Sequence, residues 1–226
     1  MSVELYDEHE QSQRVQNWLK ENGISLIMGV VLALAAIFGW RQWQNYQAAQ
    51  ADLASDYYTS VQLELQEDRL EGAVAQLNVM REAVASHSYT KLATMQVAAS
   101  QVENDQLEPA LALYQELFDA GDLQSLEPVV RLRLAQLYAA NDNSVAAIEI
   151  LSGAAPIGFE SLWLETRGDL MFDQGELNQA ENYYQQAVDQ LRGEGGNFRS
   201  VETKLNAVRS TTSEPVAAET PAAESS

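Results

Sequence analysis

Residues 168–180 read Gly-Asp-Leu-Met-Phe-Asp-Gln-Gly-Glu-Leu-Asn-Gln-Ala, and this stretch carries the pattern that decides the fold. Gly175 marks a turn between two helices, and Gly168 lies where the paired helices must approach closely. Ala180 and Tyr184 follow four residues apart, so both lie on one face of the second helix. The stretch therefore predicts a pair of antiparallel helices that pack through small residues.

The same helix pair recurs along the chain. Alanines at the crossing position of the second helix are separated by 37, 37 and 33 residues, close to the period of about 34 residues that defines tetratricopeptide repeats. A generic helical bundle, with alanines at these intervals by chance, is the alternative. Two good copies and a regular period favour an all-α, tetratricopeptide-like α-solenoid over residues 48–209. The alanines are Ala73, Ala110, Ala147 and Ala180.

Short polar or Gly/Pro clusters separate helices of about ten to fifteen residues. In the third pair, the second helix is expected to run through Ala147, Leu151 and Ala154. A further helix, from Phe198 to Val208, is expected to cap the last pair. Residues 210–226 are rich in Ala, Glu, Thr, Ser and Pro, a composition that predicts a disordered acidic tail.

An uncharged apolar run lies near the N-terminus, at residues 24–40. A helix over residues 23–43 would extend about 30 Å, enough to cross the hydrocarbon core of a bilayer. Trp40, Trp43 and Tyr46 would then lie at the far interface, where aromatic residues gather. The run predicts a transmembrane helix that contacts lipid through residues 23–43.

The apolar run is also compatible with a cleavable signal peptide or a buried core helix. Ala49-Gln50-Ala51 has the form of a signal-peptide cleavage site. However, the segment before the apolar run is long and acidic, whereas signal peptides begin with a short, positively charged segment. A buried core helix with so long an uncharged run is unusual in an acidic soluble domain.

Charge sets the expected topology. Arg14 and Lys20 precede the run and Arg41 follows it, which favours a cytoplasmic N-terminal segment over residues 1–22. The protein is thus expected in the inner membrane, crossing once, with its C-terminal domain in the periplasm. Of the 33 acidic and 13 basic residues, 28 and 11 follow the run, so the exported part carries a formal charge of −17. So acidic a body would be repelled by nucleic acid.

The sequence offers no catalytic site. It contains no cysteine and two histidines, His9 and His87, which the predicted membrane helix separates. Metal-binding spacings and a phosphate-binding loop are absent. We therefore expect a non-enzymatic protein with no catalytic residue, no cofactor-binding residue, no cofactor and no metal ligand. A membrane-anchored enzyme that uses His87 is the alternative.

A binding groove is the better expectation. In tetratricopeptide stacks the first helix of each pair lines the inner face, and projection of its usual inward positions gives a largely apolar set. Basic residues that clamp a peptide carboxylate are missing from it, so the groove suits a helix or an extended apolar segment. The chain's own capping helix is an alternative occupant. The projected positions are Leu92, Met95, Ala99, Val102, Val129, Leu132, Gln136, Ala139, Leu162, Glu165, Asp169 and Phe172; the predicted partner-binding residues among them are Leu92, Met95, Val102, Val129, Leu132 and Phe172.

Particular residues resemble a known family. Glu21-Asn22-Gly23 opens the apolar run, Gly29-Val30 lies within it, and Gly39-Trp40-Arg41-x-Trp43 closes it. With the third and fourth repeats and Lys204-Leu205-Asn206, these features resemble the ancillary subunits of the bacterial Sec translocon, the YfgM family. The resemblance covers residues 4–209.

The resemblance implies partners that the residues alone do not name. Such a protein associates with the SecYEG channel and with a PpiD-like periplasmic chaperone, and helps to pass translocated proteins to periplasmic chaperones. No nucleic acid and no small-molecule substrate is expected. A tetratricopeptide adaptor for another envelope assembly or for cell-division coordination is the alternative.

Overall fold

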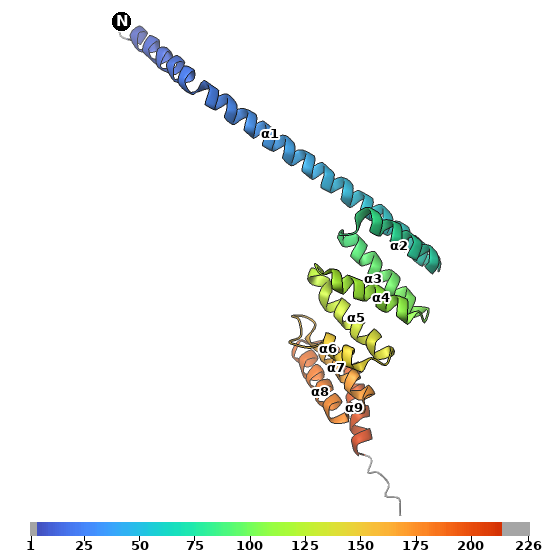
Figure 1. The fold of residues 1–226 in the computed structure, drawn as a ribbon. Coiled ribbons are helices and arrows are strands. Elements are labelled where there is room, and N and C mark those ends of the chain that lie inside the picture. Colours follow the sequence, from blue (N-terminus) through green and yellow to red (C-terminus); the bar gives the residue numbers. More distant parts are fainter. Residues whose placement is uncertain (1–3, 214–226) are drawn as a thin grey trace, which may run out of the picture. The chain divides into compact units, whose positions relative to one another are not determined.

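The computed structural model describes residues 4–213 as a succession of helices, with no strand among them (Figure 1). This confirms the predicted all-α class. The chain divides into two compact units between Asp56 and Tyr57. The elements are α1 (Glu4–Gln66), α2 (Leu70–Val84), α3 (Ser88–Glu103), α4 (Leu107–Ala120), a 3₁₀ turn η1 (Gln124–Leu126), α5 (Glu127–Ala140), α6 (Ser144–Ile150), α7 (Glu160–Asp173), α8 (Leu177–Gly193) and α9 (Arg199–Ser213).

The described part of the N-terminal unit is residues 4–56 of the long helix α1. Its described part is long and apolar enough to cross a membrane. Large apolar side chains along the run stay exposed, with Ile24 at 80% and Phe38 at 76%. Because a core helix would bury these residues, the alternative of a buried core helix is wrong. Helix α1 also continues without a break through residues 43–48, so the predicted anchor and domain are joined by helix.

The second unit consists of stacked helix pairs. Residues 57–66 of α1 pair with α2, and α3/α4, α5/α6 and α7/α8 follow, each pair contacting the next (Figure 1). The alanines at the crossing position are fully buried in all four pairs. At Gly168, a methyl group would lie 2.6 Å from the ring of Tyr184, which confirms the predicted close approach. The predicted tetratricopeptide-like solenoid is confirmed.

The turn inside each pair has one repeated geometry. The second residue after the helix end adopts a left-handed conformation, and the next amide donates a hydrogen bond to a carbonyl five residues earlier, at 2.8–2.9 Å. This arrangement satisfies carbonyls that a helix end leaves unpaired. Its recurrence shows that the repeat period extends to the turns. The left-handed residues are Asp68, Asp105, Asp142 and Gly175, with φ of 54°, 57°, 57° and 76°.

The third pair departs from the pattern, because α6 has only 7 residues and ends at Ile150. The prediction that Ala154 continues this helix is wrong. Gly153, at φ 87°, lies in an irregular segment that replaces the missing turns, and Pro156 lacks the amide hydrogen that a helix interior needs.

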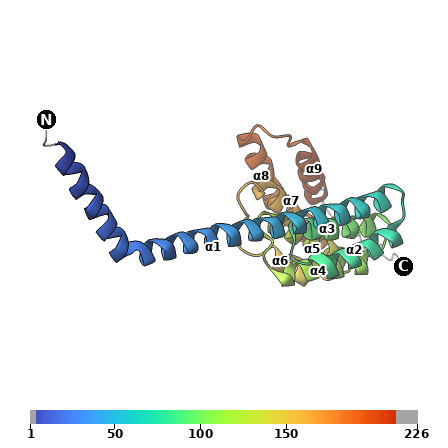
Figure 2. The same ribbon diagram turned by 90° about the horizontal axis from the view of Figure 1, so that it is seen from above.

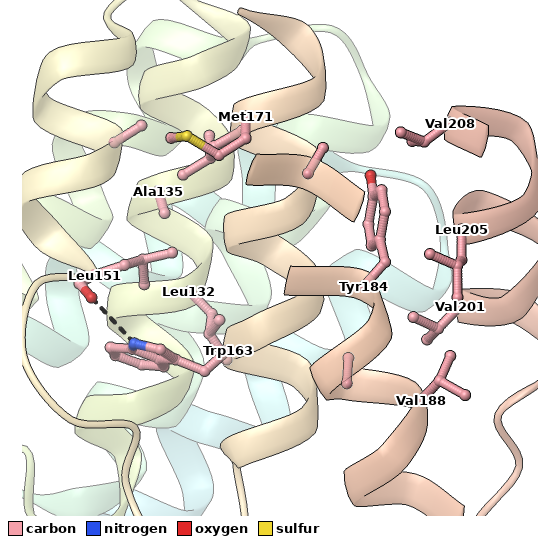
Figure 3. Packing of buried hydrophobic residues seen from close by; sticks show 14 residues of the cluster. Leu132, Ala135, Leu151, Trp163, Met171, Tyr184, Val188, Val201, Leu205 and Val208 are labelled. Atoms are coloured by element: carbon pink, nitrogen blue, oxygen red, sulfur yellow. Dashed lines mark hydrogen bonds between the residues drawn. The ribbon is translucent and has the colours of Figure 1, made fainter. Parts of the chain in front are cut away.

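Side chains of α5 and α7 satisfy the carbonyls that the early end of α6 leaves free. Arg131 donates to the carbonyls of Ile150 (2.8 Å) and Ser152 (3.1 Å). Arg167 donates to Leu151 and to Gly153, the latter at 2.9 Å. The indole of Trp163 also donates to Leu151, at 3.1 Å (Figure 3). We call these three side chains, Arg131, Trp163 and Arg167, the α6 clamp.

Helix α9 closes the last pair. It lies beside α8 (Figure 2), and its Val201, Leu205 and Val208 point toward Tyr184 and Val188 (Figure 3). The predicted capping helix is thus present at 199–213, longer than expected. Residues 210–213, expected in the disordered tail, are helical, and the rest of the predicted tail lies outside the described residues.

Candidate partner-binding groove

The inner face of the second unit carries two adjoining hollows. The larger, of about 410 Å³, lies between α3, the start of α4, and α5. The smaller, of about 260 Å³, lies between α5 and α7. Gln136 and Ala140 line both, so the hollows form one groove along the later turns of α3, α5 and α7. The lining residues are Ala99, Val102, Glu103, Leu107, Tyr114, Arg133, Gln136, Leu137, Ala139, Ala140, Thr166, Asp169, Leu170 and Asp173.

Small side chains make this groove. Ala99 and Ala140 are exposed within it, and Ala139 is half-buried, so the helix backbones are accessible from the inner face. Among the described residues, Arg133 is the one basic residue of the lining, and it donates to Gln136 at 3.0 Å. The larger hollow is lined mostly by apolar side chains, and the smaller one combines alanine and leucine with polar groups. Such a lining suits a polypeptide segment that has both an apolar and a polar face.

Of the six predicted partner-binding residues, only Val102 lines one of the two hollows. Val102 is 37% exposed and lines the larger hollow. Phe172 is 41% exposed but lies outside both hollows. Leu92, Met95 and Val129 are half-buried, and Met95 packs against the core around Tyr114.

Leu132 has a different role from the one expected. It is only 4% exposed and belongs to the core cluster that includes Trp163 and Leu170 of the next pair. The prediction that Leu132 lines the groove does not agree with this packing. Helical periodicity predicted the inward side of α5 only approximately. It cannot show which of those inward positions are buried against the next helix pair.

Other projected positions do line the groove. Ala99, Gln136, Ala139 and Asp169 appear in its walls, all in the middle or later turns of their helices. Sequence reasoning missed Glu103, Arg133, Ala140 and Asp173, which also line it. Three of them, Glu103, Ala140 and Asp173, are the last residues of their helices at the turn inside each pair, a position that the projection of inward residues did not weigh.

The capping helix engages part of the inner face. Lys204 of α9 contacts Asp169 at 2.7 Å and Glu165 at 2.8 Å. Tyr184 donates to the same Asp169 at 2.7 Å. The expectation that the chain itself covers some inner positions therefore holds for Glu165 and Asp169.

Two pKa values in this cluster are shifted. Partial burial alone lowers the pKa of Lys204, but its bonds to Asp169 and Glu165 outweigh burial and raise it. The pKa of Tyr184 is raised far above its ordinary value, first by burial and then by its bond to the negatively charged Asp169. In the groove wall, burial also raises the pKa of Tyr114. Lys204 therefore stays charged at neutral pH, and its contacts with Asp169 and Glu165 form a structural ion-pair cluster.

The histidine considered for catalysis has a structural contact. His87 precedes α3, and its Nδ1 accepts a hydrogen bond from the amide of Tyr89 at 3.3 Å. It therefore caps the helix start. Among the side chains that the structure describes, from Arg14 to Thr212, no group of three or more His, Asp or Glu residues has the arrangement of a metal site.

An apolar helix followed by a stack of helix pairs with an open inner groove defines a tetratricopeptide-type binding protein with a candidate membrane anchor. The family model described as "Tetratricopeptide repeat-like domain" matches residues 16–210, and the chain belongs to that family.

Curated relatives cover most of the chain. It is 29% identical over 188 residues to the "Ancillary SecYEG translocon subunit" of Escherichia coli, covering 82% of this chain and 90% of the relative. It is 25% identical to the Haemophilus influenzae protein of the same name, covering 88% and 97%. A crystal structure of Podosopora anserina kinesin light chain repeats aligns with a TM-score of 0.46 at 14% identity, covering 71% of this chain and 97% of that one.

Proposed function

We propose that this protein is a non-enzymatic scaffold of the Sec translocon, anchored in the inner membrane by residues 23–43. The observation that supports this most strongly is a single chain with an apolar helix long enough to cross a bilayer and a helical-repeat unit with an open groove. Both curated relatives are named as translocon subunits, and each match extends over most of both chains.

In this proposal the two units have separate tasks. The anchor holds the protein beside the channel, and the groove holds polypeptide segments of a partner on the periplasmic side. The partner is a PpiD-like periplasmic chaperone, and the complex helps to pass emerging proteins to periplasmic chaperones. A scaffold of this kind needs a shaped surface and no reacting group, in agreement with the lining of the groove.

Affinity purification from membranes of the native host tests the association. We expect SecYEG subunits and a membrane-anchored chaperone to co-purify with the full chain. Ala140→Trp, which fills the groove, should reduce recovery of the chaperone and leave the channel subunits in place. Glu82→Trp, on the exposed face of α2, is the matched control. Recovery of a different envelope complex, without SecYEG, would replace this proposal with the alternative of another envelope adaptor.

Orientation has a separate test, because the chain contains no cysteine. A cysteine at Ser210 should react with an impermeant maleimide in intact spheroplasts, whereas one at Ser12 should react only after the membrane is opened. The reverse pattern would place the solenoid in the cytoplasm and overturn the periplasmic part of the proposal.

A further inference from the structure

The groove margin is formed by the negative ends of three helices. Helices α3, α5 and α7 each end at the turn inside their pair, and none has a basic residue in its last turn. The carbonyls at a helix C-terminus carry a partial negative charge, and Lys or Arg there normally stabilises the helix. At this margin, all three helix C-termini lack that stabilising basic residue.

Carboxylates add to the negative charge at the same margin. Glu103 lines the larger hollow and Asp173 the smaller, while Asp105 and Asp142 lie exposed in the adjoining turns. Within residues 4–213, none of the four forms an ion pair with a basic side chain. We call Glu103, Asp105, Asp142 and Asp173 the acidic margin.

Several basic side chains elsewhere in the solenoid are already engaged. Arg81 pairs with Glu116, and Lys91 pairs with Asp122 at 3.1 Å. The two arginines of the α6 clamp bind carbonyls. The acidic margin therefore does not find its counter-charge among these residues, and a bound partner can supply it.

Helix α9 supplies one such counter-charge to carboxylates of α7. It presents apolar Val201 and Leu205 to the last pair while Lys204 reaches Glu165 and Asp169 on α7. Helix α9 packs beside α8 and lies in neither hollow, but it shows that carboxylates of α7 can be paired by a lysine that lies beside the apolar face of a helix.

We infer that the groove binds a cationic amphipathic helix of a partner protein, with apolar side chains in the two hollows and Lys or Arg at the acidic margin. This inference rests on the proposed function and adds the chemistry of the segment bound. Charge complementarity supports a basic segment, and the alanine-lined floor supports an apolar face in contact with it.

Peptide binding to the full chain, held in nanodiscs of zwitterionic lipid, tests the inference. The probes are two fluorescent amphipathic peptides with the same leucine face, one with lysine and one with glutamine on the polar face. Fluorescence anisotropy should show tighter binding of the lysine peptide. Glu103→Gln with Asp173→Asn should weaken binding of the lysine peptide by about tenfold (about 1.4 kcal/mol), since two exposed ion pairs are lost. Empty nanodiscs give the background.

The matched control removes two acidic residues away from the groove, with Glu82→Gln and Asp189→Asn, both exposed on second helices. This control should change binding of the lysine peptide less than twofold (about 0.4 kcal/mol or less). Equal loss in both pairs of substitutions would mean that net charge alone attracts the peptide, and would overturn the inference.

Ala140→Trp separates this inference from the proposed function. If both peptides bind equally well and Ala140→Trp abolishes both, the groove is a binding site but the cationic preference is wrong. If neither peptide binds and Ala140→Trp still reduces recovery of the chaperone from membranes, the inference fails and the proposed function stands. If neither effect occurs, both fail.

Discussion

At the residue scale, the direction in which each side chain of α5 points decides whether it serves the core or the groove. Leu132 lies in the core cluster with Trp163, whereas Gln136 and Ala140 line the groove. Because successive helical residues are rotated by about 100°, a small error in the assumed face exchanges core and groove positions.

Leu132→Ala should lower the free energy of unfolding by about 3 kcal/mol, because it leaves a cavity beside Trp163. Val102→Ala, at an exposed groove position, should cost less than about 1 kcal/mol. Urea denaturation monitored by circular dichroism measures both. A small effect of Leu132→Ala would contradict its placement in the core.

Gly168→Ala should also destabilise the fold, by about 1 kcal/mol or more, although alanine favours helix more than glycine does. The reason is that the added methyl group would lie 2.6 Å from the Tyr184 ring. Gly193→Ala is the control, because nothing lies within 4 Å of its added methyl group. A gain in stability for Gly168→Ala, measured by thermal unfolding, would show that the pair does not pack through Gly168.

At the element scale, the sequence predicted the helices and their breaks well but not the length of α6. Period and small residues located Ala147 and the other crossing alanines, since close packing requires them in every pair. The early end of α6 depends on the α6 clamp, in which Arg131 and Arg167 reach carbonyls 14 to 21 residues away in sequence. Contacts at such separation leave no local pattern to recognise.

The α6 clamp gives a local prediction. Arg131→Met and Arg167→Met should each lower the free energy of unfolding by about 1–2 kcal/mol, because each removes a hydrogen bond from a charged group to a partly buried carbonyl. Hydrogen exchange should accelerate most in residues 144–153. Arg199→Met, at an exposed position, should leave exchange there unchanged; equal acceleration in all three variants would argue against the clamp.

Helix α9 and α8 together set an alkaline limit to stability. The pKa values of Tyr184 and Lys204 are raised in the folded state, so the fold holds protons that the unfolded chain releases near pH 10. Their contribution to stability is complete below about pH 10 and is lost as the pH rises further. Between pH 9 and 11, the melting temperature of the unchanged protein should fall more steeply than that of Tyr184→Phe with Lys204→Met. Parallel curves would contradict this.

At the scale of the whole molecule, the proposed function depends on two units with different partners. The apolar part of α1 exposes its side chains, as a lipid-facing helix must, and the second unit exposes a groove made by three helix pairs. The sequence predicted both units from hydropathy and from the repeat period. The groove walls depend on how the pairs stack, which those two patterns do not specify.

Site-specific photo-crosslinking in native membranes tests the proposed scaffold role most directly, with one probe at Ala36 in the apolar helix and one at Ala140 in the groove. We expect the probe at Ala36 to crosslink to SecYEG subunits and the probe at Ala140 to a periplasmic chaperone, while a probe at Glu82 gives neither product. An intact, membrane-bound protein that yields no crosslink to SecYEG or a chaperone from either Ala36 or Ala140 would contradict that role.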